Sequence, residues 1–183
     1  MYKLNMKILN KMVNGVSTDS VKYYLNGIHV YDKDGKRYYE ATDGHVLFRA
    51  ITYFDGDTLP QDYIIQMQKE LKSKITECEL VIADSTTAVI KADVKQAFDI
   101  IDGSFPEVER VIPKDRELAK EYTAFAIDIL KKLEKFYGDS KIISTIPYMA
   151  DKTAPALWEW TENGVDYTAG AMPMRVVEGG LGD

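Results

Sequence analysis

The sequence predicts an α+β fold in which antiparallel sheets carry a few helices on one face. The order strand, helix, several strands recurs three times, over residues 1–60, 61–113 and 117–177. Asp34-Gly35 and Asn163-Gly164 are hairpin signals, which join antiparallel neighbours. The predicted strands are short and joined by turns, as in antiparallel sheets with helices on one side.

The first unit, 1–60, begins with a short strand at residues 2–4. Apolar residues at helical spacing follow and end at Gly15, so the first helix range is Lys3 to Gly15. Residues 21–32, 37–42 and 46–53 are rich in β-branched and aromatic side chains and predict strands.

The second unit, 61–113, is predicted to open with a helix from Asp62 to Ile75. Asp62 would cap this helix, and its apolar stripe would be Ile64, Ile65, Met67 and Leu71. Short strands are expected at 79–83, 87–91 and 97–101.

The third unit, 117–177, predicts a strand at 121–124 and a helix from Ile127 to Tyr137 that Gly138 ends. Further strands are expected at 141–146, 157–160 and 165–171. Trp158 and Trp160 share one sheet face, where a core or subunit-interface role is expected. The glycine-rich residues 178–183 are predicted to form a flexible tail.

Composition indicates a soluble globular protein, since 45% of the 183 residues are hydrophobic and 28% are charged. No apolar run approaches the ~20 residues needed to span a bilayer, and the N-terminus lacks the apolar core of a signal peptide. The single cysteine, Cys78, excludes an internal disulfide and fits a reducing cytoplasm. It lies between two glutamates, which disfavour a reactive thiolate.

The net charge of −6 is unevenly distributed. The three predicted helix ranges carry +3, +1 and +1, which leaves −11 for the remainder. Such a chain can present a basic surface on one side, although lysines that only coat solvated helix faces would give the same count.

No constellation for chemistry is evident, so neither an enzyme nor a cofactor is expected. Asp43 and Gly44 are turn residues, and His45 is expected to fix a loop. His29 has no cysteine or second histidine at ligand spacing, so no metal is expected. Asp32, Asp34, Asp55 and Asp57 do not follow a calcium-loop pattern and are interpreted as hairpin turns.

Three motifs occur in a fixed order: 23–27 leading to Ala41-Thr42-Asp43-Gly44-His45, then Asp102-Gly103-Ser104-Phe105-Pro106 with Arg110-Val111-Ile112-Pro113, then Met172-Pro173-Met174-Arg175. In this order they resemble the bacterial DNA polymerase III beta sliding clamp family. The resemblance implies a DNA-clamp fold and a protein that performs no chemistry. It also implies that 1–113 is one complete domain of two halves, 1–60 and 61–113, and that 117–177 is a single half-domain.

The resemblance further implies a groove that receives short peptides from DNA polymerase, clamp loader and repair proteins. The matching positions are Thr42, Gly44, His45, Val46, Leu47, Pro106, Arg110, Val111, Met172, Pro173, Met174 and Arg175, with Phe125 as a further wall. Two departures weaken this transfer. The family usually has a basic residue where Val46 stands, and this chain continues beyond Arg175 to Asp183, so that Leu181 could occupy the groove.

The helices would line a ring around duplex DNA, which they would contact without sequence specificity through Lys7, Lys11, Lys69, Lys72, Lys131, Lys132 and Lys135. Twelve helices at about 8–10 Å spacing leave a hole of about 24 Å, whereas six leave about 7 Å. With three helices per chain, a homo-oligomeric ring of four chains is therefore expected rather than a dimer. The alternatives are a groove-bearing adaptor or decoy that forms no ring, and an enzyme that no residue set supports.

Overall fold

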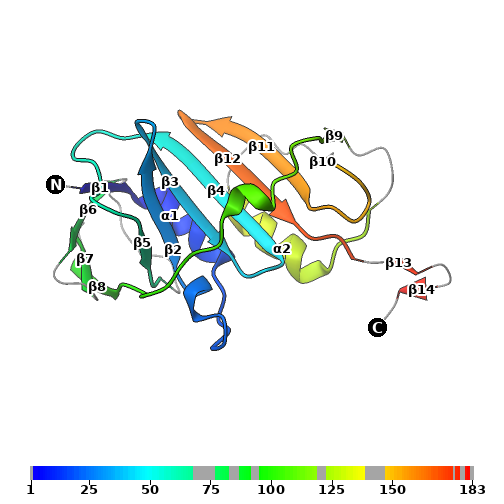
Figure 1. Ribbon diagram of the computed structural model, residues 1–183, viewed down its shortest axis with the longest axis horizontal. Helices are drawn as coiled ribbons and strands as arrows, with labels where there is room; N and C mark the ends of the chain where they lie inside the picture. Colours follow the sequence, from blue (N-terminus) through cyan, green and yellow to red (C-terminus); the bar gives the residue numbers. More distant parts are fainter. Residues whose placement is uncertain are drawn as a thin grey trace.

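The computed structural model describes residues 2–67, 77–82, 87–91, 95–118, 123–138, 147–174, 176–177 and 180–181 (Figure 1). The first part of the chain forms β1 (Tyr2–Asn5), α1 (Met6–Met12), the 3-10 turns η1 (Val13–Gly15) and η2 (Tyr23–Leu25), β2 (Ile28–Lys33), β3 (Lys36–Thr42), β4 (Val46–Tyr53) and β5 (Tyr63–Ile65). The middle part forms β6 (Glu77–Ile82), β7 (Thr87–Lys91), β8 (Lys95–Asp99) and η3 (Val108–Arg110). The last part forms β9 (Glu117–Leu118), α2 (Ile127–Tyr137), β10 (Tyr148–Met149), β11 (Ala156–Glu162), β12 (Val165–Ala171), β13 (Val176–Val177) and β14 (Gly180–Leu181).

An eight-stranded antiparallel sheet, in the order β5-β2-β3-β4-β12-β11-β10-β9, forms the centre of the molecule. The predicted hairpins are present in it. Asp34 and Gly35 have φ of 52° and 74°, and Asn163 and Gly164 have φ of 52° and 76°. Positive φ at both central positions is the turn geometry that matches the twist of paired strands.

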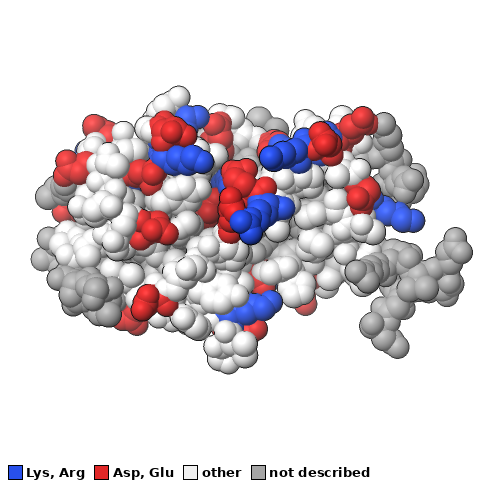
Figure 2. Space-filling view, in the orientation of Figure 1, with Lys and Arg blue, Asp and Glu red and all other residues white. Residues whose placement is uncertain are grey.

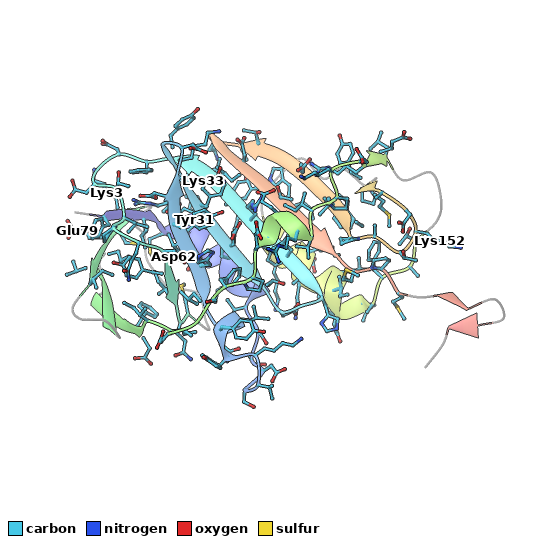
Figure 3. The ribbon with its side chains drawn as sticks, in the orientation of Figure 1. Lys3, Tyr31, Lys33, Asp62, Glu79 and Lys152 are labelled. Carbon is cyan, nitrogen blue, oxygen red and sulfur yellow. The ribbon has the colours of Figure 1, made fainter. Side chains whose placement is uncertain are left out.

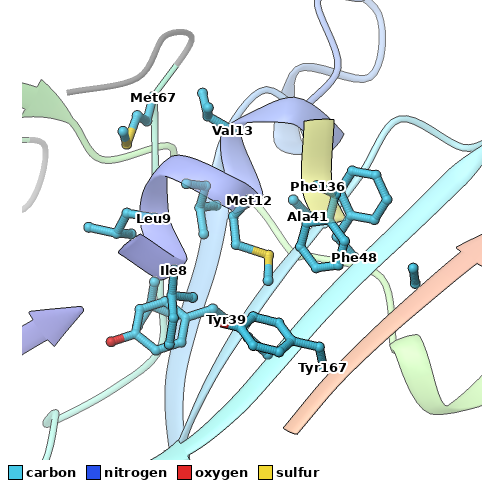
Figure 4. Close-up of a cluster of buried hydrophobic side chains, with 14 of the residues drawn as sticks. Ile8, Leu9, Met12, Val13, Tyr39, Ala41, Phe48, Met67, Phe136 and Tyr167 are labelled. Atoms are coloured by element: carbon cyan, nitrogen blue, oxygen red, sulfur yellow. The ribbon is translucent and has the colours of Figure 1, made fainter. Parts of the chain in front are cut away.

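Helices α1 and α2 lie together on one face of this sheet, behind it in Figure 1. Ile8, Leu9 and Met12 of α1 are fully buried in the core that the helices share with the sheet (Figure 4). Phe136 of α2 stacks on Phe48 of β4, with ring centroids 4.0 Å apart and planes 3° apart. The prediction of an α+β fold with helices on one face is confirmed.

The second sheet, in the order β1-β6-β7-β8, shows that the first two predicted units exchange strands. Strand β1 pairs with β6, while β5 pairs with β2 in the large sheet. Strand β4 pairs with β12 over seven residue pairs, so the large sheet continues from the first unit into the third. The division into a 1–113 domain and a 117–177 half-domain stays a prediction.

The predicted helix from Asp62 to Ile75 is wrong at its start. Residues Tyr63–Ile65 form β5, which pairs with Ile28–Val30 of β2. A run of tyrosine and two isoleucines fits a buried strand as well as a helix, and here the pairing with β2 decides. The rest of that predicted helix, residues 68–75, lies outside the described residues.

Most other boundaries are close to prediction. Helix α2 spans the predicted residues and ends at Gly138, which has φ of 58°. Helix α1 begins at Met6, later than predicted, because the Asn5 side chain caps it by accepting from the Lys7 and Ile8 amides at 3.0 and 3.2 Å.

Two strand predictions fail in part. Residues 23–25 form the 3-10 turn η2, and residues 123–124 lie in no strand. The predicted strand at 141–146 falls outside the described ranges. No helix in the described part of the chain is long and apolar enough to cross a membrane.

Candidate functional site

A groove of about 270 Å³ lies where the β3–β4 turn, the end of β12 and residues 101–113 meet. Residues 101–113, called the wall segment below, cross the sheet on the side opposite the helices, with η3 in front of β4 and β12 (Figure 1). The groove is mainly apolar. Its lining residues are Lys22, Tyr24, Leu25, Thr42, Gly44, His45, Val46, Leu47, Pro106, Glu107, Val108, Val111, Pro155, Leu157, Gly170, Ala171 and Met172.

The β3–β4 turn forms one edge of the groove and is fixed by its own side chains. Thr42 Oγ1 donates to the Val46 carbonyl at 2.6 Å and accepts from the Gly44 amide at 3.1 Å. Asp43 Oδ1 accepts from the His45 and Val46 amides at 2.8 and 2.9 Å. Gly44 has φ of 92°, a conformation that favours glycine. The turn therefore presents His45 at the groove in a defined position.

Asp43 also connects this turn to the helix layer, because Lys132 of α2 donates to its second carboxylate oxygen. Burial by itself would raise the pKa of Asp43. The hydrogen bonds from Lys132 and from the two turn amides outweigh burial and lower that pKa below its ordinary value. Asp43 is therefore ionised at neutral pH and ties the groove edge to α2.

Strands β4, β12 and β11, which are neighbours in the large sheet, form the floor of the groove. Gly170 lies opposite both Leu47 of β4 and Leu157 of β11 in the register. A Cβ at Gly170 would lie 3.1 Å from Leu157 Cδ2 and 3.3 Å from Leu47 Cβ. The missing side chain at this position therefore keeps the floor open. Beyond β12, the Met172 amide donates to the His45 carbonyl at 2.9 Å and closes the end of the groove.

The structure brings eight of the predicted groove residues together around this cavity: Thr42, Gly44, His45, Val46, Leu47, Pro106, Val111 and Met172. The others are placed differently. Arg110 projects into solvent with its side chain 82% exposed and pairs with Glu107 at 2.5 Å. Phe125 packs on Trp158, with centroids 5.7 Å apart, and lies partly buried against the core. Pro173 and Met174 follow the lining residues without joining them, and Arg175 lies outside the described residues.

Sequence reasoning missed nine lining residues: Lys22, Tyr24, Leu25, Glu107, Val108, Pro155, Leu157, Gly170 and Ala171. Six of these could have been found, because they lie within or beside the quoted motifs: Lys22, Tyr24, Leu25, Glu107, Val108 and Ala171. Leu157 and Gly170 join the groove lining only because β12 pairs with both β4 and β11, and no local sequence pattern reveals this pairing.

The predicted DNA-facing lysines fall into three groups. Lys7, Lys131 and Lys135 are exposed on α1 and α2, although Lys131 lies 3.6 Å from Asp128. Lys11 and Lys132 have protein partners: Lys132 binds Asp43, and Lys11 donates to the Tyr137 carbonyl at 2.8 Å and lies 3.6 Å from Glu162. Lys69 and Lys72 lie outside the described residues.

The structure shows the surroundings of His29 and of the two tryptophans, Trp158 and Trp160. His29 contacts carboxylates on both ring nitrogens, from Glu40 at 3.2 Å and from Asp62 at 3.1 Å. Within the described ranges, no group of three or more His, Cys, Asp or Glu side chains is arranged to hold a metal. Trp158 is buried in the core and Trp160 packs against it partly buried, which fits the expected core role.

The chain is similar to known proteins in sequence and in fold. No family model matches the chain. It is 32% identical over 120 residues to the beta sliding clamp of Rickettsia bellii, covering 60% of this chain and 31% of that protein. It is 25% identical over 149 residues to the beta sliding clamp of Pseudomonas aeruginosa, covering 72% of this chain and 40% of that protein.

Solved structures of sliding clamps have a similar fold along nearly the whole chain. The DNA polymerase III beta subunit of Thermotoga maritima matches with a TM-score of 0.69 and 14% identity over 96% of this chain and 65% of that one. The sliding clamp of Pseudomonas aeruginosa matches with a TM-score of 0.69 and 17% identity over 96% of this chain and 66% of that one. The chain is similar in sequence to bacterial beta sliding clamps. It has the sliding-clamp fold, and it spans 31% and 40% of the length of these two curated clamps and less than two thirds of the solved ones.

Proposed function

We propose that this chain is a clamp-like processivity factor of DNA replication, which encircles duplex DNA and tethers client proteins through the groove. The observation that carries the proposal is the groove itself. Eight residues that the resemblance to sliding clamps assigns to peptide binding, from three separate parts of the chain, line one cavity. Matches to sliding clamps in sequence and in fold support the same conclusion.

The chemistry of the groove suits a short peptide with leucine and aromatic side chains. Val46, Leu47, Val111 and Met172 supply an apolar lining that includes a flexible thioether. His45 lies at the turn that forms the edge, where a side-chain nitrogen can hydrogen-bond a peptide backbone. A client held in this way needs no other contact with the chain to remain near DNA.

Peptide binding tests this part of the proposal. A fluorescein-labelled short peptide containing leucine and phenylalanine should bind the protein in an anisotropy titration. Val111→Glu should weaken binding at least about tenfold, since it buries an unpaired charge against the ligand. Val111 is 50% exposed, so the fold should tolerate the change, and Val21→Glu, at an 81% exposed position outside the groove, is the matched control. Equal affinities of the two variants would refute a groove-bound peptide.

Encirclement of DNA is the second part, and we propose a ring of four chains. The count assumes three helices per chain. The structure describes α1 and α2, and the remaining helix range, 68–75, lies outside the described residues. A ring should stay on closed circular plasmid at salt concentrations that abolish phosphate contacts, and should leave after the plasmid is linearised. Equal loss from both forms of DNA would contradict encirclement.

A second candidate, a peptide-binding adaptor or decoy that forms no ring, is favoured by the surface of α2. Ile127 and Leu130 are 68% and 45% exposed on this helix. Lys132 on the same helix is paired with Asp43. A helix face with exposed apolar residues fits a protein partner better than it fits phosphates. Such a module would bind the test peptide as well, but would not distinguish circular from linear DNA.

A further inference from the structure

Three ionisable side chains line up across neighbouring strands on the sheet face opposite the helices. His29 of β2 lies opposite Glu40 of β3, and Glu40 lies opposite Arg49 of β4. The Glu40 carboxylate contacts His29 Nδ1 at 3.2 Å and accepts from Arg49 Nε at 2.9 Å and Tyr31 Oη at 3.3 Å. Glu40 and Arg49 are buried, with side chains 2% and 6% exposed.

A buried ion pair of this kind adds little net stability to the fold. Removing a carboxylate and a guanidinium from water costs as much as their attraction returns, unless hydrogen bonds satisfy them well. Burial by itself would lower the pKa of Arg49, but the carboxylates of Glu40 and Glu109 outweigh it and raise that pKa. Arg49 is therefore a permanent cation whose guanidinium plane is set by Glu40.

The outer ends of this ion network reach toward solvent and toward the groove. His29 Nε2 contacts the exposed Asp62 carboxylate at 3.1 Å. Figure 3 labels Asp62 and Tyr31 on this face, beside β5 and β2. Arg49 NH1 donates to Glu109 at 2.8 Å, and Glu109 belongs to η3 in the wall segment. Around the network, Figure 2 shows acidic and basic side chains mixed on this face.

The wall segment rests on the network at two points. Phe105 stacks on the His29 ring, with centroids 4.8 Å apart and planes 18° apart, and Glu109 is held by Arg49. Between these anchors lie Pro106 and Val108, which line the groove. Among the described residues, backbone hydrogen bonds from 102 to 111 stay inside the segment, from the Arg110 amide to Glu107 and from Val111 to Val108.

We infer that the network of Asp62, His29, Glu40, Arg49 and Glu109 positions the wall of the groove for its peptide. Arg49 is the positioning residue: Glu40 fixes its guanidinium, and its remaining nitrogen fixes η3 through Glu109. None of these five residues is among those that line the groove. The inference deepens the proposed function and depends on it only for the peptide, because the position of the wall can be measured without one.

The test uses Glu109→Lys, which places a cation against Arg49 at a side chain that is 61% exposed. Asp102→Lys is the matched control, because it makes the same charge change in the same segment, at an exposed residue outside the network. Hydrogen exchange of the Arg110 and Val111 amides is measured in the peptide-free protein, together with the urea midpoint and the anisotropy titration of the labelled leucine-phenylalanine peptide.

The inference predicts that Glu109→Lys speeds exchange at these two amides about three- to tenfold. This is less than the loss of a fully buried charged hydrogen bond would give, because the Glu109 side chain is 61% exposed and solvent screens the pair. It also predicts weaker peptide binding by a similar factor, with a urea midpoint like that of Asp102→Lys. Glu109→Gln, which still accepts a hydrogen bond from Arg49, should fall between wild type and Glu109→Lys.

Unchanged exchange in Glu109→Lys would overturn the inference, as would faster exchange with unchanged peptide affinity. A wild-type protein that binds no peptide would instead refute the proposed function. In that case, the exchange data alone would decide whether the network holds the wall.

Discussion

A single substitution at Asp43 should break the link between the groove edge and the helix layer. Asp43→Asn keeps one oxygen to accept from the His45 and Val46 amides, but it turns an amide donor toward the Lys132 ammonium. A hydrogen bond between charged groups contributes about 1.5–3 kcal/mol. The Lys132 side chain is 38% exposed, so solvent screening reduces the expected loss to about 1 kcal/mol.

The effect should depend on pH with a definite sign. The folded-state pKa of Asp43 is lowered, so its contribution is fully present above the unfolded pKa of about 3.9 and is lost as pH falls through the folded value. Wild type should therefore exceed Asp43→Asn in stability at neutral pH. The difference should shrink below about pH 4.

Urea unfolding across a pH series measures both effects, and a double-mutant cycle with Lys132→Met isolates the pair. The coupling free energy should be about 1 kcal/mol at neutral pH and close to zero in acid. Asp128→Asn is the control, because it breaks a pair with Lys131 in which both side chains are largely exposed. An Asp43→Asn deficit that is the same at neutral and acid pH would refute this reasoning.

Three further predictions concern the core, the floor and the helix face. Phe136→Ala should destabilise the protein by about 3–5 kcal/mol in urea unfolding, because it empties the fully buried stack on β4; a loss below about 1 kcal/mol would contradict that packing. Gly170→Ala should cost about 1 kcal/mol and weaken peptide binding severalfold, since its methyl group enters the floor; unchanged affinity would count against this floor. Lys7→Glu with Lys135→Glu should lower affinity for duplex DNA and reduce the slope of affinity against salt by about one unit per lost phosphate contact; an unchanged slope would remove these lysines from the DNA surface.

Local signals in the sequence predicted elements well where one pattern dominated. Helix α2 was predictable because Ile129, Leu133 and Phe136 form one apolar stripe and Gly138 ends it. Strand β12 was predictable from the Asn163-Gly164 turn that precedes it. Strand β5 was not, because a three-residue apolar run carries no period, and only the pairing with β2 determines its state.

The site was predictable where its residues lie close together in the sequence. Resemblance to sliding clamps identified the turn residues from Thr42 to Leu47 and, in the wall segment, Pro106 and Val111. The ion network was missed because His29, Glu40 and Arg49 become neighbours only through the register of three strands. A shift of one residue in that register would turn each side chain to the other face, so sequence spacing alone could not place them together.

The solution mass of the protein, measured by light scattering over a concentration series with and without duplex DNA, tests the central claim most directly. Ring assembly predicts a stable species of about four times 20.7 kDa. A monomer or dimer at every concentration, with DNA present, would contradict the ring and leave the adaptor as the function that the groove supports.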